Sequence, residues 1–346
     1  MCGIFGFAKT NGRQSDNQLD ILKRVFTELT DESSIRGTDS TGFSIMDDTN
    51  RFTYKTLLDS SSLVDTDSWN TEILNRITRD TTIVMGHVRL ATQGSIKVQN
   101  AHPFNIGRVT GAHNGIIYNY NQVAKQLGKD IPDVDSQVLF QSLNKNSKAN
   151  AFKEIDGDFA ITWVKDSNKQ IHLGRESGRP MVVAYWKNAR TLLWPSTKNI
   201  LLDAMTRAGL VLPIKKIKED YVFTYDVDNF DKSPNRTQEK FETISQYDNY
   251  SRRYYGHGNT AWGGYHYYGF GNSNNGYSSS PATSMITDGS SSTPQKKVEM
   301  CDYCYEWVDT DEIWTDASSR KVCFDCEYFP SAYDSKEVDN EDSCPF

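Results

Sequence analysis

The sequence predicts an α+β protein whose sheets are mainly antiparallel and are covered by helices. Residues 3–8 form a short apolar run followed by the turn pair Asn11-Gly12, which is typical of a buried strand. Residues 16–30 then place apolar side chains at helical spacing, which indicates an amphipathic helix on that strand's sheet. Farther along, expected strands outnumber expected helices and follow one another at hairpin-like spacings, which favours antiparallel pairing.

The remaining elements are expected from the same kinds of apolar pattern. Strands are expected at residues 42–46, 52–57, 82–88, 108–113, 157–164, 171–175, 181–186 and 221–225. Helices are expected at residues 119–127, 135–143 and 198–206.

Composition divides the chain into four regions. Residues 1–245 have the composition of a globular domain, whereas residues 246–296 are rich in Tyr, Gly, Asn and Ser. This second region lacks the aliphatic side chains that offset ordering entropy, so we expect a flexible linker, although its aromatic residues could also stack on bases or self-associate. A small cysteine-rich module is expected at residues 297–330, and residues 331–346 are expected to form an acidic, disordered tail.

The charge and hydropathy of the chain exclude several classes of protein. A net charge of -7 and a pI near 5.5 argue against nonspecific nucleic-acid binding, which needs a basic surface. No run of about 18 apolar residues is present, so no membrane span is expected. The N-terminus lacks the basic and apolar regions of a signal peptide, which favours a cytoplasmic protein.

Cys2 is the first candidate for chemistry, because it directly follows Met1 and precedes Gly3. Removal of Met1 would leave a cysteine with a free α-amino group, whose pKa of about 8 allows it to act as a base toward the thiol. One residue would then provide both the nucleophile and the base. The alternative is a buried N-terminal strand with an incidental cysteine.

Further sequence motifs accompany Cys2 in the first domain. They are Arg-Gly-Thr-Asp-Ser-Thr-Gly at 36–42, Gly-His-Val-Arg-Leu-Ala-Thr-Gln-Gly at 86–94, Asn-Ala-His-Pro-Phe at 100–104 with Ala-His-Asn-Gly at 112–115, and Asp-Ser-Gln at 135–137. Together with the N-terminal Met-Cys-Gly-Ile, this set closely resembles the class II glutamine amidotransferases. These form the N-terminal-nucleophile branch that includes the glutaminase domains of glucosamine-6-phosphate synthase and amidophosphoribosyltransferase. The resemblance covers about residues 2–210 and implies a four-layer αββα sandwich of the N-terminal-nucleophile hydrolase type.

The resemblance implies hydrolysis of the side-chain amide of L-glutamine. Cys2 would attack the amide carbonyl, form a γ-glutamyl thioester and release ammonia, without a catalytic cofactor. Preorganised donors must stabilise the oxyanion, and the Asn114 side chain and the Gly115 N–H match the oxyanion hole of the family. From the residues alone, this Asn-Gly pair could equally form a turn after the strand at 108–113.

An amino-acid substrate requires a cation for its α-carboxylate and an anion for its α-ammonium. By motif position, Arg89 with Thr92 would bind the carboxylate and Asp135 would bind the ammonium. His102 matches a histidine near the glutamine pocket of the family. From the residues alone, Arg89 could instead form a surface ion pair and Asp135 could cap a helix. His102 could be structural, and His87 is interpreted as a core histidine.

Four cysteines near the C-terminus form a second pattern, Cys301-x-x-Cys304 and Cys323-x-x-Cys326, with 18 residues between the pairs. Two such pairs can present four thiolates tetrahedrally to one Zn2+, and this spacing is typical of a zinc ribbon or a related module. The site would be structural, because a domain of this size needs such a cross-link. Cys344 is interpreted as a free thiol in the tail.

The residues between the cysteines suggest what the module binds. Acidic side chains outnumber basic ones there, and four thiolates add negative charge, which opposes phosphate binding. We therefore expect the module to bind a protein rather than nucleic acid, with Trp307 and Trp314 as anchors. Both tryptophans could instead form the core of the module.

Residues 210–346 contain no nucleotide-binding or phosphate-binding signature for an acceptor substrate. The resemblance therefore implies a glutaminase that releases ammonia for an acceptor handled by a separate partner enzyme. One alternative is a catalytically silent protein that senses glutamine or serves as an interaction module with the same pocket. Another is a hydrolase of a different amide, which would not need the pair Arg89 and Asp135.

Overall fold

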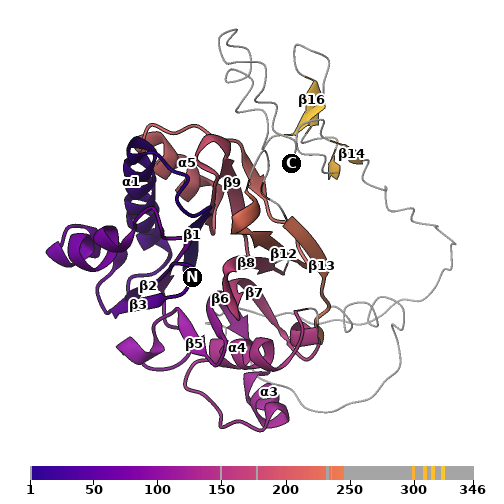
Figure 1. The fold of residues 1–346 in the computed structure, drawn as a ribbon. Coiled ribbons are helices and arrows are strands. Elements are labelled where there is room, and N and C mark those ends of the chain that lie inside the picture. Colours follow the sequence, from indigo (N-terminus) through magenta and orange to yellow (C-terminus); the bar gives the residue numbers. More distant parts are fainter. Residues whose placement is uncertain are drawn as a thin grey trace, which may run out of the picture. The chain divides into compact units, whose positions relative to one another are not determined.

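The structure is a computed structural model, and it describes most of the first 244 residues and four short C-terminal strands. The described ranges are 2–148, 150–176, 178–230, 234, 236–244, 298–300, 307–309, 313–315 and 321–323. The first five ranges belong to one compact unit, and the four strands belong to another. Figure 1 shows the course of the chain.

One sheet of the first unit has seven strands in the order β11-β9-β10-β1-β4-β2-β3, and every pairing within it is antiparallel. Its strands are β1 (Gly3–Lys9), β2 (Ser40–Met46), β3 (Arg51–Thr56), β4 (Ile83–Arg89), β9 (Val182–Trp186), β10 (Thr191–Pro195) and β11 (Ile214–Lys216). The strands β1 and β4 lie side by side in the interior of the sheet.

A second sheet has six strands in the order β13-β12-β8-β7-β6-β5, and its pairings are also antiparallel. Its strands are β5 (Phe104–Ile106), β6 (Val109–Ile117), β7 (Gly157–Lys165), β8 (Ser167–Arg175), β12 (Tyr221–Asp226) and β13 (Arg236–Lys240). Three of the four edge strands in the two sheets, β3, β11 and β13, carry Lys or Arg, and the fourth, β5, has only three residues.

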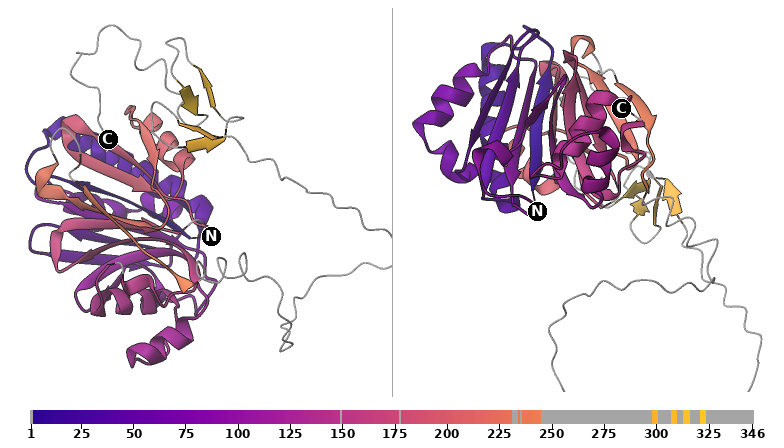
Figure 2. Two further views of the ribbon diagram at one scale, coloured as in Figure 1. Left: turned by 90° about the vertical axis from the view of Figure 1, so that its right-hand side faces the viewer. Right: turned by 90° about the horizontal axis from the view of Figure 1, so that it is seen from below.

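The two sheets pack face to face, and helices cover their outer faces (Figure 2). On the first sheet lie α1 (Asp16–Glu32) and α5 (Lys198–Arg207), which also pack against each other. On the second lie α3 (Tyr120–Leu127) and α4 (Ser136–Lys145). A short helix α2 (Ser60–Val64) packs on α1 and is followed by a π-helical turn at Trp69–Ile73. The expected four-layer αββα sandwich is thus present.

Helix α1 shows how local sequence determines an element of this unit. Ser15 precedes it and accepts a hydrogen bond from the backbone N–H of Gln18, whose side chain accepts one from the Ser15 N–H in return. The residues that the helix buries recur at three- and four-residue intervals; they are Leu22, Val25, Phe26, Leu29 and Thr30. The helix therefore presents one apolar stripe to the sheet.

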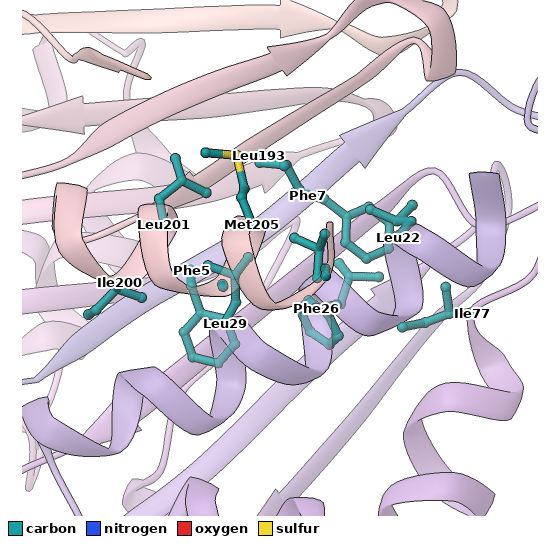
Figure 3. Close-up of a cluster of buried hydrophobic side chains, with 14 of the residues drawn as sticks. Phe5, Phe7, Leu22, Phe26, Leu29, Ile77, Leu193, Ile200, Leu201 and Met205 are labelled. Carbon is teal, nitrogen blue, oxygen red and sulfur yellow. The ribbon is translucent and has the colours of Figure 1, made fainter. Parts of the chain in front are cut away.

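Three apolar layers separate the four structural layers. The first lies between α1, α5 and the first sheet, where the rings of Phe5, Phe7 and Phe26 pack together (Figure 3). The second lies between the two sheets, and the third lies between the second sheet and its helices. Burial of these layers is the main stabilising contribution to the fold.

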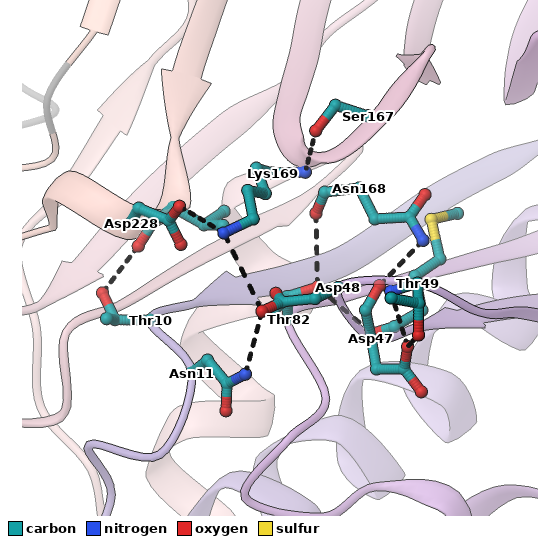
Figure 4. Close-up of polar contacts among 12 residues, drawn as sticks. Thr10, Asn11, Asp47, Asp48, Thr49, Thr82, Ser167, Asn168, Lys169 and Asp228 are labelled. Carbon is teal, nitrogen blue, oxygen red and sulfur yellow. Dashed lines mark hydrogen bonds and ion pairs between the residues drawn. The ribbon is translucent and has the colours of Figure 1, made fainter.

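Polar contacts connect the two sheets at one end of their strands (Figure 4). Asn168, near the start of β8, donates to the carbonyl oxygens of Asp47 and Asn50, between β2 and β3, at 2.7 and 3.0 Å. Lys169 Nζ lies 3.8 Å from a carboxylate oxygen of Asp48, which is also between β2 and β3. Met46 and Lys9 are the strand residues at this end, so the contacts lie far from Cys2, at the other end of β1.

Two short antiparallel hairpins make up the described part of the second unit. The strands are β14 (Val298–Met300) with β15 (Trp307–Asp309), and β16 (Ile313–Thr315) with β17 (Lys321–Cys323). The linker at 246–296, the tail at 331–346 and three of the four predicted zinc ligands lie outside the described residues. The zinc module therefore stays a prediction.

The expected strands and helices of the first domain are confirmed, with ends that differ by a few residues. The largest differences are in β6, which continues past His113 to Ile117, and in β8, which begins at Ser167 rather than at residue 171. The strands β5, β10, β11 and β13 were not expected. Among the described residues, no helix has the length and apolar character needed to cross a membrane.

We expect Phe26→Ala to lower the free energy of unfolding by about 3–5 kcal/mol, as is usual when a fully buried aromatic ring is removed. The Phe26 ring lies 5.4 to 6.0 Å from the rings of Phe5, Phe7, Phe43 and Trp69. Urea denaturation measures the loss. Val211→Ala, at a side chain that is 68% exposed, is the control and should change stability by about 0.5 kcal/mol or less. Equal effects of the two substitutions would contradict the central position of Phe26.

Candidate active site

Cys2 directly precedes β1, and the backbone of Leu90 and the side chain of Arg36 hold it. Its Sγ lies 3.4 Å from both the N and the carbonyl oxygen of Leu90, the residue after β4. The Nε of Arg36 donates to the carbonyl oxygen of Cys2 at 2.9 Å. A side chain at Gly3 would press on Val88 and Arg36, so the residue after Cys2 must be small.

The surroundings of Cys2 determine the state of its thiol. Burial raises the pKa of the thiol. The hydrogen bond from the Leu90 backbone, the N-terminal ammonium and the charge of Arg89 lower this pKa, and the charge of Asp135 raises it. Because burial is the largest effect, the thiol needs a base to become a nucleophile.

Arg89 ends β4, and its side chain is only 3% exposed. Its guanidinium donates to the carbonyl oxygen of Ser95 at 3.1 Å and to that of Gln93. The surface ion pair considered for Arg89 is therefore wrong. A guanidinium has five N–H donors, so these two bonds leave others for a ligand. Thr92, expected beside it, lies exposed in the same loop.

The segment at 36–42 fixes the backbone around Arg89. Asp39 donates its backbone N–H to the carbonyl oxygen of Arg89 at 2.9 Å, and its carboxylate accepts from the Ala91 N–H at 2.7 Å. A Cβ at Gly37 would overlap the backbone of Arg89 and Leu90, so the two segments touch through main-chain atoms. This motif therefore holds the segment that contacts the Cys2 thiol.

Asn114 and Gly115 lie within β6, opposite Ala160 and Phe159 of β7, so the turn considered for this pair is wrong. The Asn114 side chain is 1% exposed, and its Nδ2 has no hydrogen-bond partner among the described residues. Gly115 has a φ of 153°, and a Cβ there would overlap the carbonyl oxygen of Asp158. An uncommitted buried donor and a strained glycine together are consistent with the expected oxyanion hole.

Asp135 directly precedes α4 and is buried. Its Oδ2 accepts a hydrogen bond from the backbone N–H of Ile117 at 2.7 Å. Its own backbone is already helical, and its side chain caps no N–H of the helix, so the expected capping role is wrong. The carboxylate instead connects the start of α4 to the end of β6.

Three buried histidines, His87, His102 and His113, adjoin the site. His87 lies in β4, which ends at Arg89, and His113 directly precedes Asn114 in β6. His102 Nδ1 is 2.7 Å from His87 Nε2, which is 3.0 Å from the carbonyl oxygen of His113. A carbonyl can only accept, so His87 Nε2 carries the proton. His87 is a core histidine, as expected, and His102 contacts it rather than the Cys2 thiol. His113 was not singled out in the sequence, although it directly precedes Asn114 in a motif.

The structure also limits where a metal could bind. In the part of the chain that the structure describes, no group of three or more His, Cys, Asp or Glu side chains is placed to hold a metal ion. Cys301, Cys304 and Cys326 lie outside this part, and Cys323 ends β17.

The fold is a four-layer αββα sandwich with a cysteine directly before an interior strand. Residues 87–203 match the family model of the glutamine amidotransferase domain. The isomerizing glutamine–fructose-6-phosphate aminotransferase of Listeria monocytogenes is 27% identical over 204 residues, which are 54% of this chain and 31% of the relative. The enzyme of that name from Caulobacter vibrioides is 36% identical over 112 residues, or 29% of this chain and 18% of the relative.

Solved structures agree on the fold. Glutamine phosphoribosylpyrophosphate amidotransferase from B. subtilis, complexed with ADP and GMP, matches with a TM-score of 0.52 and 16% identity over 70% of this chain and 49% of its own. A structure of the allosteric regulatory enzyme of purine biosynthesis matches with a TM-score of 0.53 and 17% identity over the same shares. Part of this chain is therefore similar to the glutamine amidotransferase domain, and its fold is that of the amidotransferase structures. The aligned part spans less than a third of the Listeria relative.

We expect the free energy of unfolding to fall as the pH drops from 6.5 toward 4. Burial lowers the pKa of His87 to about 3, of His113 to about 4 and of His172 to about 3. In this pH window the unfolded chain binds protons that the folded chain excludes, so each histidine should cost about 1 kcal/mol between pH 7 and pH 5.5. Denaturation curves at both values measure the change.

His172→Gln is the control for this pH dependence, because His172 contacts Thr224 and Trp163 and none of the site residues. The variant should lose about 1 kcal/mol less than the wild type over the same interval. An identical loss in both proteins would show that the buried histidines do not cause the effect.

Proposed function

We propose that the chain hydrolyses the side-chain amide of L-glutamine through Cys2 and releases glutamate and ammonia. The observation that carries this proposal is the place of the thiol, whose Sγ lies 3.4 Å from the backbone of Leu90, the residue after the buried Arg89. Arg89 ends β4 of the first sheet, Asp135 directly precedes α4 on the second, and the buried Asn114 Nδ2 has no partner among the described residues. A cation and an anion beside a nucleophile match the carboxylate and ammonium of a free amino acid.

In the proposed reaction, removal of Met1 frees the α-amino group of Cys2, which takes the thiol proton. The Sγ attacks the amide carbonyl, and the oxyanion accepts hydrogen bonds from the Asn114 Nδ2 and the Gly115 N–H. The amino group then gives its proton to the leaving nitrogen, which departs as ammonia and leaves a γ-glutamyl thioester. Water attacks the thioester, which yields glutamate and the free thiol.

The fate of the ammonia is part of the proposal. The names of the relatives describe an aminotransferase and an amidotransferase. We propose that a separate protein handles the acceptor here, in the cytoplasm, and that the C-terminal module docks onto that protein. The second candidate, a silent glutamine sensor, is less well supported, because a sensor would need neither the thiol nor the uncommitted donor of Asn114.

We expect purified protein to release glutamate and ammonia from L-glutamine and Cys2→Ala to release neither, because alanine has no nucleophile. A coupled glutamate assay measures the rate, and intact mass checks that Met1 has been removed. Calorimetric titration with glutamine should show binding to both proteins, since Arg89 and Asp135 are unchanged. If correctly processed wild-type protein binds glutamine but releases no glutamate, this result would contradict the proposed glutaminase activity and favour the glutamine sensor.

We also propose that Cys301, Cys304, Cys323 and Cys326 hold one structural Zn2+. Two backbone features support this site. Cys301 directly follows Met300, the last residue of β14, and Cys323 ends β17, so each cysteine pair adjoins a hairpin. Thiolates are preferred zinc ligands, and the ion would stabilise a module that is too small for a large apolar core.

We expect the purified protein to contain about one zinc per chain, and the double variant Cys301→Ser with Cys304→Ser to lose it, because two thiolates cannot complete a tetrahedral site. Mass spectrometry of the metal content measures both. Cys344→Ser is the matched control, since this cysteine is outside the pattern, and it should keep its zinc. Equal zinc content in all three proteins would overturn the site.

A further inference from the structure

Buried polar side chains connect the strand that carries Asn114 to the helix that follows Asp135. His113 directly precedes Asn114, and its Nδ1 lies 2.7 Å from the Oγ of Ser136, the first residue of α4. The Ser136 hydroxyl in turn donates to Asp135 Oδ1 at 3.5 Å. All four side chains are buried. The expected oxyanion donor and the expected ammonium-binding carboxylate are thus connected through two side chains.

The donors in this connection point in one direction. If the Ser136 hydroxyl donates to the Asp135 carboxylate, its oxygen accepts from His113, and Nδ1 of that ring then carries the proton. Burial lowers the pKa of His113 to about 4, so the ring is neutral near pH 7. The 2.7 Å contact is a strong hydrogen bond, whereas the 3.5 Å contact is longer than an ordinary O–H···O bond.

Further contacts fix the same strand. The Ile117 N–H donates to Asp135 Oδ2 at 2.7 Å, four residues beyond His113 on β6. The carbonyl oxygen of His113 accepts from Nε2 of His87, which belongs to β4 of the other sheet. The strand is therefore attached to α4 at two points and to the first sheet at a third. Asn114 lies between these points and cannot move relative to Asp135 unless one of them breaks.

We propose that His113 and Ser136 are positioning residues that set the span between the Asn114–Gly115 oxyanion donors and the Asp135 carboxylate, and thereby select glutamine over the shorter asparagine. The proposal rests on the proposed function. Glutamine has one methylene more than asparagine between its amide and its α-ammonium. A rigid span can match only one of these lengths, and a misplacement of about 1 Å of the reacting carbonyl costs about a hundredfold in rate.

The test compares Ser136→Ala with Ser142→Ala in the full chain. Ser142 belongs to the same helix, is also buried, and donates its hydroxyl to the carbonyl oxygen of Ala151 at 2.8 Å. Ser142 also accepts from Asn146 Nδ2 at 3.2 Å, so each variant removes one buried hydroxyl with two hydrogen bonds, but only Ser136 contacts His113. Kinetic constants for L-glutamine and L-asparagine come from release of glutamate and aspartate.

We expect Ser136→Ala to lower kcat/KM for glutamine about tenfold or more, mainly through kcat, and to reduce the preference for glutamine over asparagine. Ser142→Ala should retain the wild-type preference and kcat/KM. Equal kcat/KM values for the two variants would overturn the positioning proposal while leaving the glutaminase intact. A wild type that releases no glutamate would overturn both.

A second pair of variants covers the case in which Ser136→Ala does not fold. His113→Asn keeps an N–H donor near the position of Nδ1, whereas His113→Leu keeps an apolar side chain of related size without the donor. The asparagine variant should exceed the leucine variant in kcat/KM for glutamine about tenfold. Equal values in this pair would show that the ring only fills space and would overturn the proposal.

Discussion

The buried guanidinium of Arg89 is the constraint on which the site depends. It is removed from water at the end of β4, and among the described residues backbone carbonyls, rather than carboxylates, hold it. A buried cation without a counter-ion is costly, so the loop from Leu90 to Ser95 must wrap around it. The same loop supplies the backbone atoms that contact the Cys2 thiol. The position of the nucleophile therefore follows from how this one charge is satisfied.

The site also depends on the packing of two separate sheets. Cys2 and Arg89 adjoin β1 and β4 of the first sheet, whereas Asn114 and Asp135 lie on and beside β6 of the second. An apolar layer that includes residues of both sheets separates them, and protein interiors of this kind are close-packed. The polar contacts at the far end, around Asn168 and Lys169, hold the sheets without involving the thiol. Site geometry is therefore set by the layer between the sheets.

Much of this arrangement could be predicted from the sequence, because apolar periodicity marks the longer strands and helices and the motifs mark the site. The errors occurred where long-range contacts override a local preference. Asn114-Gly115 has the local signature of a turn, but pairing with β7 keeps the pair extended. Asp135 has the local signature of a helix cap, but the N–H of Ile117, 18 residues away, takes its carboxylate. His113 carried no signal of its own, since its role depends on a partner 23 residues later.

The edges of the two sheets have a consequence for how the protein behaves at high concentration. An exposed edge strand offers unpaired N–H and C=O groups to another molecule and can begin aggregation. Here β3, β11 and β13 carry Lys or Arg, and β5 has only three residues. Such charges repel the same edge of a second copy, and a very short strand offers few groups to pair. The sandwich can therefore remain open-edged and still resist the strand-to-strand association that leads to fibrils.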